Sequence, residues 1–300
     1  MTLEQLRIFI AVAEKEHVTQ AALQLNLTQS ATSAAIAALE SRYGVKLFDR
    51  VGRGIALTQT GRAFLAEARG VIARARTAEA VLHDLSGLKH GSLSIAASQT
   101  VGNYWLPARL YRFQEAHPGI SLNLSIANTE QVAQQVRNGS ANLGLVEGEI
   151  DDPLLNVHEI DGDSLVVVVG ATHPWVKNPP RLPEGLLEGA WILRERGSGT
   201  RAMFETALRG FGVDPAKLDI RIELPSNEAI RAAIVTGSCA TAISNLAVTH
   251  LLAAGKLHRV EITLPKRAFY VLRHRERYSS NAERALLSDI GLSDIAPNGD

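Results

Sequence analysis

The stretch from Arg194 to Arg201, RERGSGTR, combines the residue types that bind a small anion. Its glycines let the backbone approach a ligand closely, and its hydroxyls and free N–H groups converge where a helix is expected to begin. Three arginines add positive charge. An ordinary strand-to-helix turn would use the same residues, with glycine for geometry and serine or threonine as a cap. The residues alone leave both interpretations open.

Other polar residues follow short apolar stretches that are typical of buried strands. Because the carboxyl ends of strands in α/β sheets face the ligand crevice, we expect these residues to share one site with the glycine-rich stretch. The expected ligand-binding residues are Ser98, Gln99, Thr100, Thr129, Glu147, Gly197, Ser198, Gly199 and Thr200. An ionised Glu147 would repel an anion unless an arginine neutralises it. A ligand that carries a hydroxyl or amino group therefore remains an alternative to an anion.

Signals for catalysis or metal binding are weak. The nine histidines lack metal-ligand spacing such as H-E-x-x-H, and Gly210-Phe211-Gly212 lacks the third glycine of a dinucleotide loop. Neither a Walker loop nor a nucleophile elbow is present. Cys239 begins an apolar stretch with no histidine close in sequence, which favours a buried thiol over a nucleophile. We therefore expect no catalytic residue, metal or cofactor, and no enzyme activity.

A second polar group opens a predicted helix between Leu27 and Gly44. Thr28 can cap it, Gly44 can end it, and three residues at helical spacing, Ile36, Leu39 and Tyr43, are expected to anchor one face. The short stretch TQAALQL before it predicts a second helix, which makes a helix-turn-helix. The polar first turn would then lie in the major groove of DNA, although an ordinary amphipathic helix could also begin this way.

Two short apolar stretches around Gly52-Arg53-Gly54 predict a basic hairpin after this helix, so the N-terminal region is expected to be a winged helix-turn-helix. Phosphate contacts would come from the wing and the helix, and Gln29, Ser30 and Ser33 of the helix would read base edges. The expected DNA-binding residues are Thr28, Gln29, Ser30, Thr32, Ser33, Arg50 and Arg53.

Residues 1 to about 60 resemble the DNA-binding domain of LysR-type transcriptional regulators. The matching motifs are Thr19-x-Ala21-Ala22, Leu27-Thr28-Gln29-Ser30-Ala31, Leu39-Glu40, Gly44-Val45-x-Leu47-Phe48-Asp49-Arg50 and Leu57-Thr58-x-x-Gly61. Ala34 departs from the family, which often has a basic or long polar residue there, so it can make no phosphate contact. The resemblance covers essentially the whole chain. It implies a homodimer, or a homotetramer made of two dimers, on promoter DNA. It also implies an effector bound between two lobes and contact with RNA polymerase as a further option.

Residues 59 to 87 predict one long helix of about 40 Å, at roughly 1.5 Å per residue. Apolar residues recur at steps of three and four, which makes a stripe along one face. The stripe comprises Phe64, Ala68, Val71, Ile72, Ala75, Ala78, Leu82 and Leu85. It could pack on its own domain, or pair with the same helix of a second subunit, as the resemblance implies.

From Ser92 onward, short apolar strands alternate with helices, which predicts α/β layers with largely parallel sheets. Asn227-Glu228 and Ser244-Asn245 begin two of the helices and either line the cleft or only cap them. The resemblance adds a periplasmic-binding-protein-like, two-lobed body with crossovers near Gly162 and Lys266. The expected domains are 1–58 (winged helix-turn-helix), 59–88 (linker and dimerisation helix) and 91–300 (effector-binding domain, with lobe I 91–162 and 267–300 and lobe II 163–266).

The formal net charge of the 300 residues is zero, but its distribution is uneven. Residues 1–76 hold ten lysines and arginines against six carboxylates, a balance of +4, which suits a basic head on an acidic body.

The single cysteine, the absence of a signal peptide and the lack of a long apolar run favour a soluble cytoplasmic protein with no membrane contact. We therefore expect a LysR-type regulator that binds promoter DNA and a small anionic metabolite. The alternative is a solute-binding protein or small-molecule enzyme built on the two-lobed domain.

Overall fold

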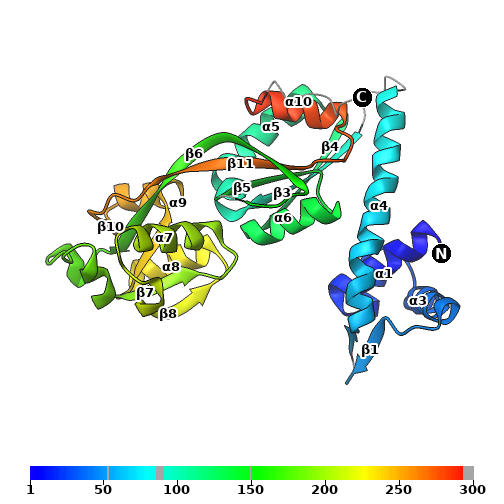
Figure 1. The fold of residues 1–300 in the computed structure, drawn as a ribbon, viewed down its shortest axis with the longest axis horizontal. Helices are drawn as coiled ribbons and strands as arrows, with labels where there is room; N and C mark the ends of the chain where they lie inside the picture. Colours follow the sequence, from blue (N-terminus) through cyan, green and yellow to red (C-terminus); the bar gives the residue numbers. More distant parts are fainter. Residues whose placement is uncertain (53, 86–90, 149, 293–300) are drawn as a thin grey trace. The chain divides into compact units, whose positions relative to one another are not determined.

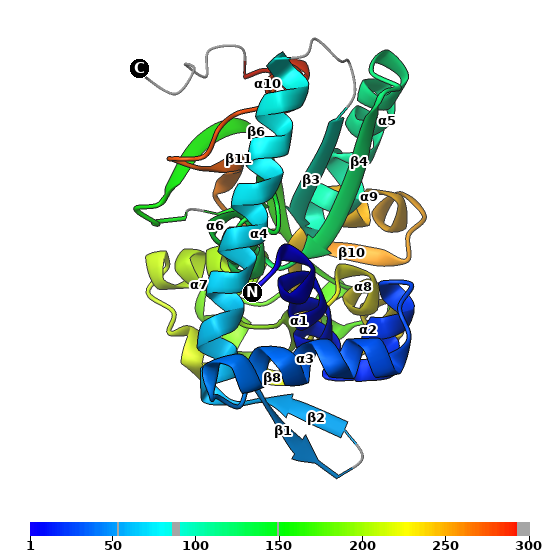
Figure 2. The same cartoon turned by 90° about the vertical axis from the view of Figure 1, so that its right-hand side faces the viewer.

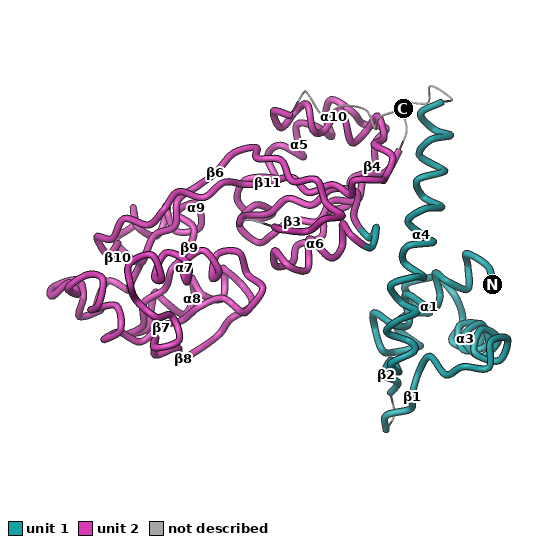
Figure 3. Tube along the Cα trace, in the orientation of Figure 1, with its two compact units in different colours: residues 1–87, 138–140 teal, residues 88–137, 141–300 magenta. Residues whose placement is uncertain are grey.

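A computed structural model describes residues 1–52, 54–85, 91–148 and 150–292. The chain divides into two compact units, residues 1–87 with 138–140 and residues 88–137 with 141–300 (Figure 3). Within the described residues, no helix combines the length and the apolar character needed to cross a membrane.

The first unit is a helix-turn-helix followed by a two-stranded antiparallel wing and a long helix (Figure 1). The predicted caps of the second helix of the motif are confirmed, because the Thr28 hydroxyl accepts from Ala31 N and Gly44 is left-handed at φ 66°. The elements are α1 (Leu3–Lys15), α2 (Val18–Gln24), α3 (Gln29–Tyr43), β1 (Phe48–Val51), β2 (Gly54–Leu57) and α4 (Gln59–Leu85).

Phe9 is the centre of this unit's core. Its ring is fully buried and lies 5.5 Å from that of Phe48 and 4.9 Å from that of Phe64, so it joins α1 to the wing and to α4. Ile36 and Leu39 anchor α3 as predicted, but Tyr43 is 53% exposed, so its predicted anchoring role is wrong. The last turn of α3 has already passed beyond the core.

The long helix α4 is buried only along part of its length. Gly61 fits against the wing because a Cβ there would meet the Leu47 carbonyl oxygen at 2.1 Å. Ala68 and Ile72 are buried against α1, whereas Leu82 and Leu85 are 67% and 79% exposed. Among the described residues, the C-terminal end of the apolar stripe is therefore exposed, on the part of α4 that extends beyond α1 (Figure 2).

The second unit contains two lobes joined by two long strands, β6 (Leu155–Gly170) and β11 (Lys266–His274), which run side by side (Figure 1). The strand order is β4-β3-β5-β11-β6-β9-β7-β8, with β10 also on β6. Pairs within each lobe such as β3–β4 and β7–β8 are parallel, but every pair of β6 and β11 is antiparallel. The prediction of largely parallel sheets is therefore wrong, because the two connecting strands run against their neighbours.

Lobe I is built on β3, β4 and β5, and lobe II on β7, β8, β9 and β10. Helices cover both faces of each sheet and enclose separate apolar cores. Lobe I contains β3 (Gly91–Ser98), the π-helix η1 (Val101–Trp105), α5 (Pro107–Ala116), β4 (Ile120–Ala127), α6 (Thr129–Asn138), β5 (Leu143–Glu147) and α10 (Asn281–Asp289). Lobe II contains the 3₁₀ turns η2 (Pro174–Val176), η3 (Glu184–Glu188) and η4 (Pro215–Lys217), with β7 (Ala190–Arg194), α7 (Gly199–Gly210), β8 (Asp219–Leu224), α8 (Asn227–Thr236), β9 (Ala240–Ser244), α9 (Asn245–Ala253) and β10 (Leu257–Val260).

Candidate DNA-binding surface and interlobe site

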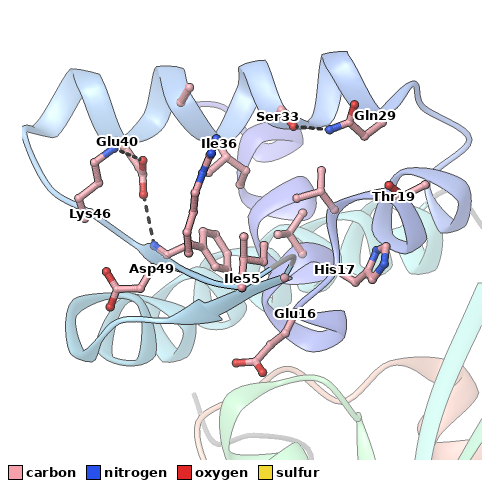
Figure 4. A pocket seen from close by; sticks show the side chains of 17 residues that line it. Glu16, His17, Thr19, Gln29, Ser33, Ile36, Glu40, Lys46, Asp49 and Ile55 are labelled. Carbon is pink, nitrogen blue, oxygen red and sulfur yellow. Dashed lines mark hydrogen bonds and ion pairs between the residues drawn. The ribbon is translucent and has the colours of Figure 1, made fainter.

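A hollow on the first unit is lined by the end of α1, by α2, by one face of α3 from Gln29 to Glu40, and by the wing (Figure 4). Gln29 and Ser33 line it from α3, Thr19 from α2, and Arg50 from β1. The sequence prediction did not include Thr19, although its position at the start of the helix preceding α3 could have indicated it. The hollow thus brings together polar groups from three elements on one concave surface.

The first turn of α3 presents its polar side chains to solvent. Gln29 and Ser30 are exposed, and the Gln29 amide donates to Ser33 Oγ at 3.2 Å. The Thr28 and Ser30 hydroxyls are 3.1 Å apart, while Thr28 Oγ1 also accepts from Ala31 N. The capped start therefore holds Gln29, Ser30 and Ser33 as a compact group of donors and acceptors.

Thr32 does not belong to this exposed group. It is fully buried, and its hydroxyl donates to the Thr28 carbonyl oxygen at 3.0 Å. We therefore correct its expected DNA contact to a structural role, which follows from its position on the inner side of the helix. Arg53 lies outside the described residues, so its contact stays a prediction, whereas Arg50 is exposed on β1.

Glu40 fixes the segment that joins α3 to the wing. Its Oε1 accepts from Leu47 N at 2.7 Å and from Phe48 N at 3.2 Å, and its Oε2 pairs with Lys46 Nζ at 3.0 Å. Burial raises the pKa of Glu40, but these hydrogen bonds and the Lys46 charge outweigh it and hold the pKa below its ordinary value. This carboxylate is structural and holds the wing in place relative to α3.

Glu147 ends β5 between the two lobes of the second unit, where it is 1% exposed. Its Oε2 accepts from Ser98 Oγ of lobe I, and its Oε1 accepts from Thr200 Oγ1 of lobe II at 3.2 Å. Among the expected ligand-binding residues, Ser98, Glu147 and Thr200 therefore meet in one buried cluster.

Arg267 supplies the cation of this cluster, and the sequence analysis missed it. Its guanidinium donates to Thr100 Oγ1 at 3.3 Å and to Thr200 Oγ1 at 3.0 Å, and it lies 3.8 Å from Glu147 Oε1. Asp163, the residue opposite it on β6, forms an ion pair with it, and both side chains are at most 2% exposed. Arg267 lies on a strand that joins the lobes, far in sequence from the glycine-rich stretch, so no local motif indicated it.

Glycines bring the two lobes into close contact. A Cβ on Gly199 would lie 2.2 Å from the Glu147 carbonyl oxygen, and Gly199 N donates to Thr129 Oγ1 at 3.2 Å. Gly197, at φ +85°, packs against Glu130, whose backbone N donates to the Gly197 carbonyl oxygen at 3.2 Å. The start of α7 therefore packs directly on lobe I.

Two of the three arginines of the glycine-rich stretch, whose positive charge was expected to attract an anion, are paired with carboxylates of this chain. Arg194 pairs with Glu195 and donates to Asn227 Oδ1, Arg201 pairs with Glu205 and Glu223, and Arg196 is exposed. Burial lowers the pKa of Arg201, but its carboxylate partners outweigh burial and raise it above its ordinary value.

Two further contacts join the lobes through the start of α8. Gln99 donates to the Pro225 carbonyl oxygen at 2.8 Å and accepts from Asn227 N at 3.0 Å, and fully buried Asn227 also reaches Thr100. Asn227 therefore lines the interlobe site, while Ser244 both caps α9 and donates to Asp163.

Tyr104 donates a hydrogen bond to the Glu228 carboxylate. Burial and this hydrogen bond raise the pKa of Tyr104 to about 12, so the phenol keeps its proton and stays a donor at neutral pH.

The family of bacterial regulatory helix-turn-helix proteins, lysR family, matches residues 3–62, and the LysR substrate binding domain matches residues 86–290. The chain is 35% identical over 295 residues to the uncharacterized HTH-type transcriptional regulator YeiE of Escherichia coli K12, covering 96% of each protein.

Solved structures have the same fold. Full-length CbnR in complex with its target DNA is 21% identical, with a TM-score of 0.68 over 98% of this chain and all of that one. The regulatory domain of Synechocystis PCC6803 CcmR in complex with 2-PG is 28% identical, with a TM-score of 0.61 over 69% of this chain and all of that domain. The family matches and the relative of nearly equal length establish that the chain belongs to the LysR family of transcriptional regulators.

Proposed function

We propose that this regulator binds promoter duplex through the start of α3 and the wing, and that a small anionic metabolite bound between the lobes alters this binding. The observation that carries the effector half is the buried cluster of hydroxyls around Arg267, which draws on both lobes. A ligand that binds one arrangement of the lobes better than another shifts the population toward that arrangement.

The proposed DNA contacts follow from exposure and position. Gln29, Ser30 and Ser33 read base edges, since amide and hydroxyl groups at a helix start can reach the major groove. Thr28 contacts the backbone beside them. Arg50 and Arg53 of the wing contact phosphate, which positions the protein without selecting sequence.

The proposed effector site comprises Ser98, Gln99, Thr100, Thr129, Glu147, Gly197, Ser198, Gly199 and Thr200, and we add Arg267. The CcmR regulatory domain in complex with 2-PG supports a small ligand at this kind of domain. We keep the proposed division into 1–58, 59–88 and 91–300, with lobes that meet near Gly162 and Lys266.

The exposed end of α4 supports a homodimer through this helix. Leu82 and Leu85 continue an apolar stripe that needs a partner helix, and a two-fold dimer presents two α3 helices to a partly palindromic operator. We propose further that two such dimers form a tetramer on promoter DNA.

Titration of the full-length protein with 2-PG, sulfate and inorganic phosphate tests the effector half. A ligand selective for the folded lobes raises the Tm by mass action and changes the Kd for promoter DNA. Thr200→Val should weaken both responses and leave promoter binding without ligand intact, with Thr249→Val on α9 as the matched control. An unchanged response in Thr200→Val would remove Thr200 from the site, and no response of the wild type to any of these anions would overturn the anionic effector.

A further inference from the structure

We infer that the carboxylate of Glu147 occupies the oxyanion position of the interlobe site, so that an effector carboxylate or other oxyanion binds by taking its place. This inference rests on the proposed function, because it concerns how the same site receives its ligand.

The surroundings of Glu147 are those of a bound anion. Both of its oxygens accept from hydroxyls, one from each lobe, and the Arg267 guanidinium lies within 4 Å. The Thr200 hydroxyl that donates to Glu147 itself accepts from Arg267 Nη1. Charged hydrogen-bond networks of this kind are the usual means by which proteins hold carboxylates.

The charge balance leaves no room for a second anion beside it. Asp163 already pairs with Arg267 through two guanidinium nitrogens, so this buried set holds one formal positive charge and two negative charges. An added oxyanion would meet a net charge of −1 at low dielectric, which is strongly unfavourable. Displacement of the Glu147 carboxylate removes that conflict.

A further donor is available next to Gly199, the residue that packs against the Glu147 backbone. Ser198 is at the N-cap position of α7 and precedes Gly199, but its side chain makes no capping hydrogen bond. It is 2% exposed, and its Oγ has no hydrogen-bond partner among the described residues. A buried hydroxyl without a partner costs free energy that a ligand oxygen would recover. This hydroxyl makes no contact with Glu147, so it is free to donate to an incoming ligand oxygen.

Chemical rescue of Glu147→Ala in the full-length protein tests this occupancy. Removing the carboxylate should lower the Tm of the effector-domain transition, and acetate should raise it again by about 2–4 °C, as expected for a gain near 1 kcal/mol in a domain of this size. Acetamide, which has the same shape without the charge, should have no such effect. Acetate should also leave wild type and Glu115→Ala, an exposed carboxylate of α5, unchanged. No difference between acetate and acetamide on Glu147→Ala would overturn the inference.

Glu147→Gln provides a second test that keeps the volume of the side chain and does not depend on the alanine variant folding. Because the internal competitor loses its charge, 2-PG should bind this variant at least about tenfold more tightly than wild type, which corresponds to about 1.4 kcal/mol. If 2-PG binds wild type and Glu147→Gln equally, the proposed effector class stands and this inference fails. If acetate rescues Glu147→Ala while no anion changes promoter binding by wild type, the inference stands and the proposed effector class fails.

Discussion

At the scale of single residues, Gln29 carries the most specific expectation. Gln29→Ala should relax sequence preference at one operator position, because a bidentate side-chain contact contributes about 1–3 kcal/mol of discrimination. Kd values for the operator and its single-base variants measure this directly. Thr32→Val is the matched control, since its side chain is buried in the same helix turn. Retention of wild-type selectivity by Gln29→Ala would show that Gln29 reads no base.

Glu283 gives the effector domain a defined pH dependence. It is nearly fully buried on α10, and burial raises its pKa from an ordinary 4.5 to about 7, although Arg273 at 4.0 Å opposes the shift. The folded protein therefore keeps a proton that the unfolded chain loses above pH 4.5. This contribution to stability is fully present below pH 4.5 and is lost as pH rises through about 7.

The free energy of unfolding should accordingly fall by about 3 kcal/mol more in wild type than in Glu283→Gln across this range, at 1.36 kcal/mol per pKa unit. Denaturant unfolding of both proteins at several pH values between 4.5 and 8 measures the difference. A stability gap between wild type and Glu283→Gln that does not vary with pH would contradict the assignment.

At the scale of elements, the start of α7 tests how closely the lobes pack. Gly199→Ala should destabilise the effector domain by about 1–3 kcal/mol, because its Cβ would overlap the Glu147 carbonyl oxygen. Gly210→Ala at the other end of the same helix is the control, since a Cβ there meets nothing within 4 Å. Thermal unfolding distinguishes the two variants. Equal stability of Gly199→Ala and wild type would mean that the lobes do not pack through this glycine.

The wing should contribute affinity without sequence preference. Arg50→Gln is expected to weaken binding to operator and unrelated duplex alike and to reduce the slope of log K against log salt by about 0.9. Arg53→Ala should behave in the same way. Fluorescence anisotropy over a range of salt concentrations measures the slope, and an unchanged slope would exclude a phosphate contact by the substituted arginine.

The exposed half of α4 should control assembly. Leu82→Glu introduces a charge into the apolar stripe and should shift the protein toward monomer, whereas Arg76→Glu, exposed elsewhere on the helix, should not. Sedimentation velocity distinguishes these outcomes. A dimer that persists in Leu82→Glu would mean that α4 is not the proposed interface.

Local patterns predicted most elements, because apolar periodicity and helix caps are short-range signals. Thr28 and Gly44 were sufficient to place α3, for example. The first half of β6 has no apolar run that would indicate a strand, because Glu159, Asp161 and Asp163 interrupt the pattern; pairing with β11 forms the strand instead. Arg267 was missed for a different reason: it joins the site only because β11 returns beside β6, a contact between residues 104 positions apart.

At the scale of the whole molecule, the regulator joins a helix-turn-helix unit to a two-lobed effector unit. The formal net charge of the entire chain is zero, so its overall charge does not favour DNA binding. Electrostatic attraction to DNA must therefore come from the first unit, where positive charge exceeds negative charge by four within residues 1–76, while selectivity comes from the base contacts proposed for α3. Specific binding of this kind usually exceeds non-specific binding by a factor of about 10³–10⁷.

The most direct test is the affinity of the purified full-length protein for its own promoter fragment and for an unrelated duplex at physiological salt. The account predicts a preference for the promoter of at least about 10³-fold, and a change in promoter affinity when the effector site is filled. Equal affinity for the two duplexes, with and without 2-PG, sulfate or inorganic phosphate, would contradict it.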